Sequence, residues 1–169
     1  SLVLVPGIAQ VGVEDNVSSS TASGDASVAI NNTAGTLAVT SSAAANGLTA
    51  GTANSVMNQG IYQSATNNGV KSATFTPAAA AALTNAKGAT VTVGTNAVAT
   101  GTNSSANAIM NRSIYQDAKI GAPGNHGTTS ASVTNNGTLG VNANATAGTA
   151  TSATANATAA NLGAIVQGD

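Results

Sequence analysis

Two eleven-residue stretches decide how this chain folds. They are Ala-Asn-Ser-Val-Met-Asn-Gln-Gly-Ile-Tyr-Gln at residues 53–63 and Ala-Asn-Ala-Ile-Met-Asn-Arg-Ser-Ile-Tyr-Gln at residues 106–116. Between them they contain both methionines of the chain, Met57 and Met110, and both tyrosines, Tyr62 and Tyr115. Each pair is 53 residues apart, and residues this rare do not coincide through composition bias. The sequence therefore predicts an internal repeat.

A shorter motif, Ile-x-Gln, extends the repeat toward both ends of the chain. Its four copies, with isoleucine spacings of 53, 53 and 51, are Ile8 and Gln10, Ile61 and Gln63, Ile114 and Gln116, and Ile165 and Gln167. This spacing predicts three repeats, at residues 8–60, 61–113 and 114–164. Residues 1–7 are then the tail of a preceding repeat or an N-terminal strand, and residues 165–169 the start of a following repeat.

An asparagine supplies a second anchor in the middle of each repeat. Asn32, Asn85 and Asn136 each precede the next motif isoleucine by 29 residues. The second half of the repeat is thus predicted to have a constant length. The shortening of the third repeat is then expected between Ile114 and Asn136, where residues 122–127 have a composition typical of a loop.

Apolar and polar residues alternate through the third repeat. The odd positions from Leu139 to Ala147 are apolar and the even ones mostly polar, and the alternation resumes from Ala153 to Ala159. Such alternation is typical of half-buried strands, and we expect three or four strands in each repeat. The stretch from Pro77 to Leu83 is also compatible with a helix, because proline suits a first helical turn and alanine favours helix.

The composition favours a thin architecture. Hydrophobic residues make up 42% of the chain, but many are alanine, whose methyl group buries little area. Alanine on one side and Thr, Asn or Ser on the other suits closely stacked sheets. The predicted fold class is therefore all-β: a repeat-built β-solenoid or stacked β-sheet fibre unit with about three repeats of 51–53 residues.

The composition also argues against several classes of function. Only 5% of residues are charged, the net charge is −1, and cysteine and tryptophan are absent. An enzyme needs clustered acids, bases or nucleophiles, so we expect no catalytic residues and no cofactor. The few cations are scattered, which argues against nucleic-acid binding. The apolar stretch at residues 2–5 is too short to span a bilayer.

Two polar features are candidates for a catalytic or metal site. His126 has no neighbouring carboxylate or hydroxyl pattern of a triad or metal site, so we expect it to be a loop residue. Glu14, Asp15 and Asn16, with Asp25 nearby, offer oxygen ligands that calcium would accept. The glycine-rich repeat of calcium-binding β-helices is absent, and no metal site is predicted.

The repeat motif points instead to assembly. Residues one repeat apart superpose in stacked sheets, so the motif glutamines are expected to form an amide ladder, with Tyr62 stacked on Tyr115. The alternative is that the motif is only a well-packed strand edge. Soluble β-proteins protect exposed sheet edges with lysine, proline or bulges, and this chain has three lysines and three prolines. We therefore expect copies of the chain itself, or neighbouring repeats, as its partners.

The stretch Asn-Asn-Gly-Thr-Leu-Gly-Val at residues 135–141, followed by alternating alanines, resembles repetitive passenger segments of bacterial autotransporter-like surface proteins. The regularly spaced Gln and Asn are also similar, more weakly, to curli-like and Fap-like functional amyloids, whose repeats are shorter. Both resemblances imply an exported structural protein, extracellular or at the cell surface. They imply a subunit or segment of a self-assembling filament or stalk, with a role in adhesion or biofilm.

A binding module is the alternative function. A surface adhesin for an unknown ligand, or an ice-binding β-solenoid, would present a flat face of Thr, Asn and Ala. Thr-x-Thr steps such as Thr90 to Thr92 and Thr149 to Thr151 favour ice binding, because spaced hydroxyls and methyls order water. These steps do not recur at a short fixed period, which argues against it.

Overall fold

The structure is a computed structural model, and it describes residues 8–9, 13–19, 24–46, 50–121, 126–148, 152–159 and 163–167. Every regular element within these residues is a β-strand. In chain order the strands are β1 (Ile8–Ala9), β2 (Val13–Ser19), β3 (Ala26–Asn32), β4 (Thr36–Asn46), β5 (Ala50–Met57), β6 (Ile61–Asn67), β7 (Ala78–Asn85), β8 (Thr90–Thr100), β9 (Asn103–Met110), β10 (Ile114–Ile120), β11 (Thr128–Asn135), β12 (Thr138–Gly148), β13 (Ser152–Ala159) and β14 (Gly163–Gln167).

These strands form four sheets, and neighbours in each sheet are parallel. The strand orders are β1-β5-β9-β13, β2-β6-β10-β14, β3-β7-β11 and β4-β8-β12. Hydrogen-bonded neighbours are always four strands apart in the chain, so each set of four strands makes one complete turn of the polypeptide. This winding confirms the predicted all-β, repeat-built and solenoid-like fold, with four strands in each full turn.

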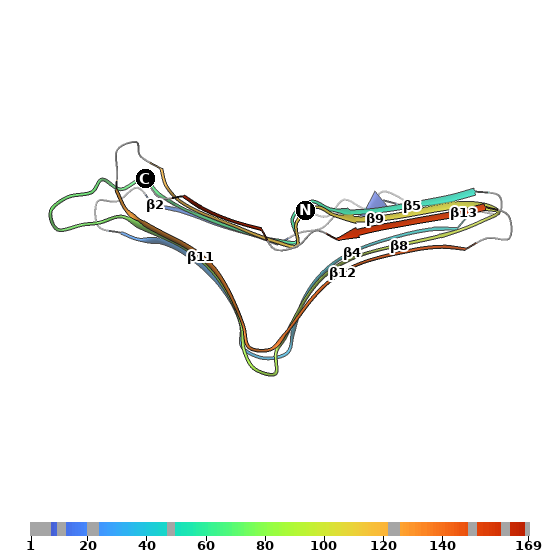
Figure 1. Cartoon of the computed structure of the whole chain (residues 1–169), viewed down its shortest axis with the longest axis horizontal. Helices are drawn as coiled ribbons and strands as arrows, with labels where there is room; N and C mark the ends of the chain where they lie inside the picture. The colour runs from blue at the N-terminus through green and yellow to red at the C-terminus, as the bar shows by residue number, and fades with distance from the viewer. Residues whose placement is uncertain are drawn as a thin grey trace.

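The superposed turns trace an outline with three tips (Figure 1). The sheet of β6 faces that of β7 and forms what we call the first arm, while the sheets of β8 and β9 face each other and form the second arm. The chain reverses at the first tip between β6 and β7 and at the second-arm tip between β8 and β9. The third tip lies between β7 and β8, below the region where the arms meet.

Small side chains fill both arms. In the second arm, Ala53, Ala97 and Ala106 belong to a buried cluster made only of alanines. In the first arm, Ala65, Ala81 and Ala118 pack in the same way, with Val28 added. Each alternates with an outward-facing residue, as the side-chain geometry of a strand requires. Alanine therefore lets two sheets pack closely where leucine would separate them.

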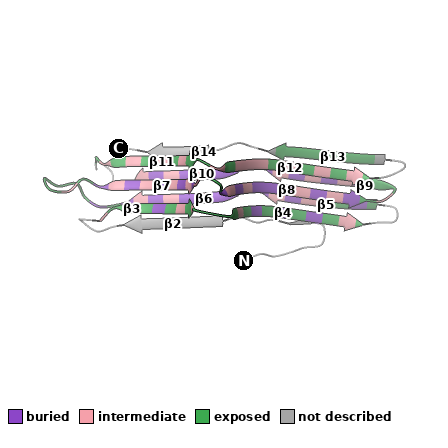
Figure 2. Cartoon of the chain, turned by 90° about the horizontal axis from the view of Figure 1, so that it is seen from below, coloured by how far each residue is buried: buried purple, intermediate pink, exposed green. Residues whose placement is uncertain are grey.

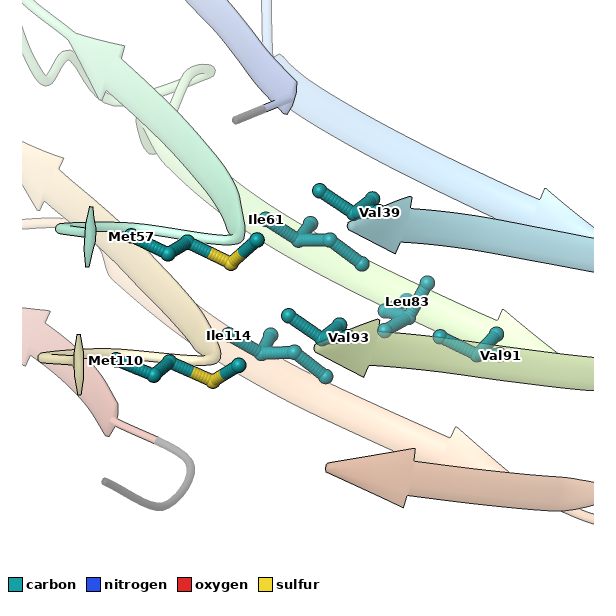
Figure 3. Close-up of a cluster of buried hydrophobic side chains, with 8 residues drawn as sticks. All are labelled: Val39, Met57, Ile61, Leu83, Val91, Val93, Met110 and Ile114. Carbon is teal, nitrogen blue, oxygen red and sulfur yellow. The ribbon is translucent and has the colours of Figure 1, made fainter. Parts of the chain in front are cut away.

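The large apolar side chains gather at the junction of the two arms (Figure 3). The cluster consists of Val39, Met57, Ile61, Leu83, Val91, Val93, Met110 and Ile114. Met57 and Ile61 flank the tight turn between β5 and β6, and Met110 and Ile114 flank the same turn one repeat later. The repeat motif thus provides four of the eight side chains of this core, at the place where the sheets diverge and leave room for long side chains.

Burial is deepest in the middle turn, β6 to β9 (Figure 2). Strands β7 and β8 bury the residues of their inward face, whereas the equivalent face of β11 and β12 is only half-buried. The middle turn is covered by a turn on each side, and the outer turns are covered on one side alone. A single repeat is therefore not self-sufficient.

The strand pairing corrects three expectations from the sequence. Residues 78–85 form β7, so the helical alternative at Pro77 to Leu83 is wrong. Asn135, not Asn136, pairs with Asn85. The second half of the repeat was expected to have a constant length, but the offset between paired residues is 53 for β6 and β10, 50 for β7 and β11, 48 for β8 and β12, and 49 for β9 and β13.

The outer copies of Ile-x-Gln are out of register with the inner ones. Ile61 pairs with Val13 on one side and Ile114 on the other, while Ile8 in β1 pairs with Asn54 of a different sheet. At the other end, Ile165 pairs with Asp117. Ile61 and Ile114 therefore occupy the same position in successive turns, and Ile8 and Ile165 do not share it.

Candidate assembly faces and side-chain ladders

The stack of turns ends in strands that have a partner on one side only. Within the described part of the chain, β11 pairs only with β7, and β12 only with β8. The edges of β11 and β12 that face away from these partners form what we call the C-terminal face. Strands β3 and β4 pair with β7 and β8 from the opposite side, and their outer edges form the N-terminal face.

The backbone groups of the C-terminal face follow from one hydrogen bond. The amide of Thr138 donates to the carbonyl of Ala89 at 2.9 Å, so Thr138 is directed toward β8. Successive residues of a strand in a parallel ladder direct their backbone groups to opposite sides. The N–H and C=O groups that point away from β8 are therefore those of Leu139, Val141, Ala143, Ala145 and Ala147.

The N-terminal face carries the complementary set. The amide of Thr90 donates to the carbonyl of Gly35 at 2.8 Å, which directs the neighbouring Thr36 away from β8. The outer edge of β4 therefore has the same order of N–H and C=O groups as the edge of β8 that bonds to β4. In the same way, the outer edge of β12 matches the edge of β8 that bonds to β12. A second copy placed head to tail would find donors opposite acceptors in these strands.

Gln63 and Gln116 form the predicted amide ladder in the interior of the first arm. The two side chains are 0% and 1% exposed, and Gln116 Nε2 donates to Gln63 Oε1 at 2.8 Å. The same nitrogens reach across the arm, from Gln63 to the carbonyl of Ala82 at 2.8 Å and from Gln116 to that of Ser132 at 2.9 Å. The ladder therefore fixes both the stacking of turns and the pairing of the facing sheets.

The structure contains two asparagine ladders that the sequence did not lead us to predict. At the tip between β7 and β8, Asn32 Nδ2 donates to Asn85 Oδ1 at 3.0 Å, and Asn85 Nδ2 donates to Asn135 Oδ1 at 2.8 Å. Asn32 and Asn85 also donate to the carbonyls of Thr90 and Thr138, which tie down the turn. The mid-repeat asparagines of the sequence were the signal for this ladder. In the third repeat the sequence spacing selects Asn136, whereas the ladder residue is Asn135.

The second ladder runs along the outer surface of the second arm. Asn107 Nδ2 donates to Asn54 Oδ1 at 2.8 Å, and Asn156 Nδ2 donates to Asn107 Oδ1 at 2.9 Å. Asn111 Nδ2 also donates to Asn58 Oδ1 at 2.8 Å, in a pair of only two residues. Asn54 and Asn107 lie in the two stretches that define the repeat. Their spacing of 53 residues could therefore have predicted that they stack.

Glycine enables the turn beside the first of these ladders. Gly35 and Gly88 adopt φ angles of 76° and 81°, in the left-handed region where a side chain is strained. Both follow a ladder asparagine, Asn32 or Asn85, by three residues. The combination of a bonded amide and a permissive glycine explains why the chain reverses at this tip in the first two turns.

Hydroxyl groups take the place of amides inside the second arm. Ser55 Oγ lies 2.8 Å from Ser41 Oγ and 2.6 Å from Thr95 Oγ1, and all three residues are buried. Thr95 also donates to the carbonyl of Ser55 at 3.2 Å. These polar groups are satisfied by one another, so the narrow alanine interior tolerates them.

The two tyrosines stack on the outer surface, as predicted. The rings of Tyr62 and Tyr115 are 5.5 Å apart between centroids and inclined by 14°. Arg112 lies 4.3 Å above the Tyr115 ring, in the geometry of a cation–π contact. The other inner motif residues, Met57, Met110, Ile61 and Ile114, are buried in the junction core rather than on an assembly face.

The outermost motif residues do not extend these ladders. Ile8 lies in β1, and Gln10 lies outside the described residues. Ile165 and Gln167 lie in β14, where their backbones pair with Asp117 and Lys119 rather than with Ile114 and Gln116. Sequence comparison could not detect this difference, because an Ile-x-Gln tripeptide fits more than one strand.

The described residues hold few charged or metal-binding groups. No three His, Cys, Asp or Glu residues in that part of the structure are grouped as a metal site would need. The calcium alternative at Glu14, Asp15 and Asn16 concerns side chains outside the described part. His126 is exposed and lies just before β11, outside any strand, as expected of a loop residue. Lys119 and Asp117 form an ion pair at 3.7 Å.

Among the described residues no helix is long and apolar enough to cross a membrane. We compared the chain with protein-family models, with curated proteins and with solved structures, and none of the three comparisons found a match.

Proposed function

We propose that this chain is an extracellular structural protein, a subunit or segment of a self-assembling surface filament or stalk. The observation that carries the proposal is the pair of complementary open faces on a stack of parallel turns. Edge strands of this kind recruit further strands unless something protects them. In this fold, the recruited strands would come from a second copy or from further turns of the same polypeptide.

The four strands that form the two open faces lack the usual protection, whereas β2, a further edge strand, carries Glu14 and Asp15. Strands β3, β4, β11 and β12 contain no lysine, no proline and no other charged residue. Lysine, proline and inward-pointing charges are the common means by which β-proteins prevent edge-to-edge pairing. Their absence from all four strands supports assembly through these faces.

The side-chain ladders also support assembly. Amide ladders along the stacking axis are typical of cross-β assemblies, because each new layer adds the same hydrogen bonds as the last. In this chain, glutamine, asparagine and tyrosine ladders all run along that axis. Location outside the cell rests on the compositional resemblance to exported surface proteins, and immunogold labelling of intact cells tests it.

Proline substitutions at the C-terminal face test the proposal. Ala145 directs its N–H away from β8, so Ala145→Pro removes no hydrogen bond within the chain but blocks an incoming strand. We expect this variant to keep its β-sheet circular dichroism and to lose filaments in electron micrographs. Asn144 directs its N–H toward β8, and Asn144→Pro is the matched variant, expected to destabilise the fold itself.

Two outcomes would contradict self-assembly. One is a native chain that stays monomeric in sedimentation up to concentrations of hundreds of micromolar. The other is an Ala145→Pro variant that is folded and assembles as fast as the native chain. In either case an adhesin that works as a single rod would become the better explanation.

The ice-binding alternative finds no support in the strand register. Thr90 pairs with Thr36 and Thr138, but Thr92 pairs with Ala38 and Gly140. The Thr-x-Thr step therefore does not recur in adjacent turns, as a lattice-matched surface would need. The step at Thr149 to Thr151 lies outside the described residues.

A further inference from the structure

The two tyrosines are the side chains of this protein that one-electron oxidants attack most readily. Tryptophan and cysteine, which compete with tyrosine for such oxidants, are absent from the sequence, and Tyr62 and Tyr115 are its only tyrosines. Met57 and Met110, whose sulfur atoms are also oxidised easily, are fully buried in the junction core. An oxidant at the surface of the molecule would therefore act first on the tyrosine pair.

The fold places the two phenol rings face to face. Tyr62 is the direct register partner of Tyr115 in the parallel strands β6 and β10. The ring centroids are 5.5 Å apart, and the ring planes are inclined by only 14°. In such a stack the carbons next to each phenol oxygen lie beside the neighbouring ring. The two rings therefore need no diffusional encounter before they react.

Both rings are accessible to an oxidant and have room to turn. Tyr62 and Tyr115 alternate with the inward-facing residues of β6 and β10, and they are only half-buried on the outer surface of the first arm. A reagent in solution can reach the phenols from this side. The rings can also tilt from the face-to-face stack into the twisted arrangement of two directly bonded rings.

Arg112 covers the second face of the Tyr115 ring. Its guanidinium carbon lies 4.3 Å from the centroid of that ring. The 5.5 Å between the tyrosine centroids is too short to hold a guanidinium group between the rings, so Arg112 lies on the face that Tyr62 leaves open. One face of Tyr115 is thus shielded by Arg112 and the other is directed at Tyr62, which favours coupling within a chain over coupling between chains.

We propose that Tyr62 and Tyr115 are a modification site at which oxidation forms a dityrosine cross-link between successive turns. The oxidant belongs to the class that removes one electron at a time, such as hydrogen peroxide activated by a haem peroxidase. Each phenol loses one electron and its hydroxyl proton, and the unpaired electron spreads to a carbon next to the oxygen. One such carbon from each ring then forms the new carbon–carbon bond.

Proton transfer completes the reaction. Each newly bonded carbon releases its hydrogen as a proton and each oxygen regains one, which restores both aromatic rings and both phenols. The pair has then lost two hydrogen atoms in total, and one molecule of hydrogen peroxide has been reduced to two molecules of water.

The cross-link joins one turn of the solenoid covalently to the next. Tyr62 and Tyr115 are 53 residues apart and lie in neighbouring strands of one sheet, so the bond closes a loop of one complete turn. A cross-link that closes a loop of this length restricts the unfolded chain and lowers the equilibrium constant for unfolding by about a thousandfold. Turns held together by strand pairing and side-chain ladders thereby gain a covalent reinforcement.

Peroxidase treatment of the dilute native chain tests the site. We expect dityrosine fluorescence to appear in the monomer, with a mass lower by two hydrogen atoms. Proteolytic digestion should release a cross-linked pair of peptides that contain Tyr62 and Tyr115. Photo-oxidised ruthenium tris-bipyridine with persulfate is a much smaller one-electron oxidant and should give the same product, so access of the enzyme does not decide the result.

Two matched controls separate the phenols from the fold. Tyr62→Phe keeps an aromatic ring in the stack but lacks one phenol, and we expect it to retain its β-sheet circular dichroism and to form no cross-link in the monomer. The native chain unfolded in urea keeps both phenols but loses the stack. With the ruthenium reagent, its yield of monomeric cross-link should fall by about tenfold or more.

Three results would overturn the cross-link. They are a native monomer that neither oxidant cross-links, a product that consists only of covalent dimers, and equal yields from the folded and the unfolded chain. A cross-linked monomer with an unchanged urea midpoint would contradict the reinforcement. Because these measurements use the monomer, their outcome does not depend on whether filaments form.

Discussion

The middle turn and the outer turns are built from the same repeat, yet they differ in what surrounds them. Val93 in the middle turn is fully buried, while its counterpart Val141 is only half-buried. The same holds for Ala97 and Ala145, and Asn85 is buried while its counterpart Asn135 is exposed. The difference shows that burial in this fold comes from the turn above and the turn below. Pairs of equivalent substitutions can therefore measure what an additional turn contributes.

The largest difference is expected in the alanine arm. Ala97→Leu forces a large side chain into a cluster of alanines that is closed on both sides, and we expect a loss of about 3 kcal/mol in the free energy of unfolding. Ala145→Leu lies on the open side, where the sheet has room to relax, and should cost less than about 1 kcal/mol. Urea unfolding of dilute protein measures both, and equal losses would contradict the comparison.

The asparagine ladder should show the next largest difference. Asn85 is buried, accepts from Asn32 and donates to Asn135, Thr138 and Ala89, so Asn85→Ala breaks the ladder on both sides and should cost about 2–3 kcal/mol. Asn135→Ala removes one exposed end of the ladder and should cost below about 1 kcal/mol. Thermal unfolding of the two variants decides between this ranking and a ladder that contributes equally at every position.

The junction core permits a test with identical side chains. Val93→Ala removes two methyl groups from a fully buried site, and we expect a loss of about 2 kcal/mol. Val141→Ala at the half-buried site should cost about half as much. In assembled filaments Val141 becomes covered, so the two variants should then reduce filament stability equally. A persistent difference in filaments would argue that the C-terminal face stays open.

The surface contact of Arg112 and Tyr115 should contribute least. Arg112→Ala removes an exposed cation–π contact and is expected to cost about 0.5–1 kcal/mol. Arg112→Lys keeps the charge and should recover part of this loss. A reduction beyond about 2 kcal/mol would mean that the arginine has a structural role that its exposed position does not indicate.

The sequence was sufficient to predict the repeat and the strands. Met57 and Met110, with Tyr62 and Tyr115, established the repeat because rare residues cannot match by chance. The alternation around Leu139 to Ala147 identified β12 because a strand buries every second residue. The ladder of Gln63 and Gln116 and the tyrosine stack followed from the common spacing, and the structure confirms both.

The register at the ends could not be predicted in the same way. Ile8 and Ile165 occur in the same Ile-x-Gln tripeptide as Ile61. Strand pairing depends on whole strands, however, and the partner of Ile61 in β2 is Val13. Which sheets face each other was also hidden, because alanines such as Ala65 and Ala97 are interchangeable in any narrow interior. The strand at residues 78–85 was also not evident from local sequence. Its pairing between β3 and β11 outweighs the helical preference of alanine.

Residue-resolved hydrogen exchange along β12, before and after assembly, tests the central claim most directly. In the isolated chain we expect slow exchange at Gly140, Asn142 and Asn144, whose amides face β8, and fast exchange at Val141 and Ala143, whose amides face outward. Assembly by strand stacking should make this alternation disappear, with all five amides protected. If filaments form while Val141 and Ala143 still exchange rapidly, copies associate through another surface and the account is wrong.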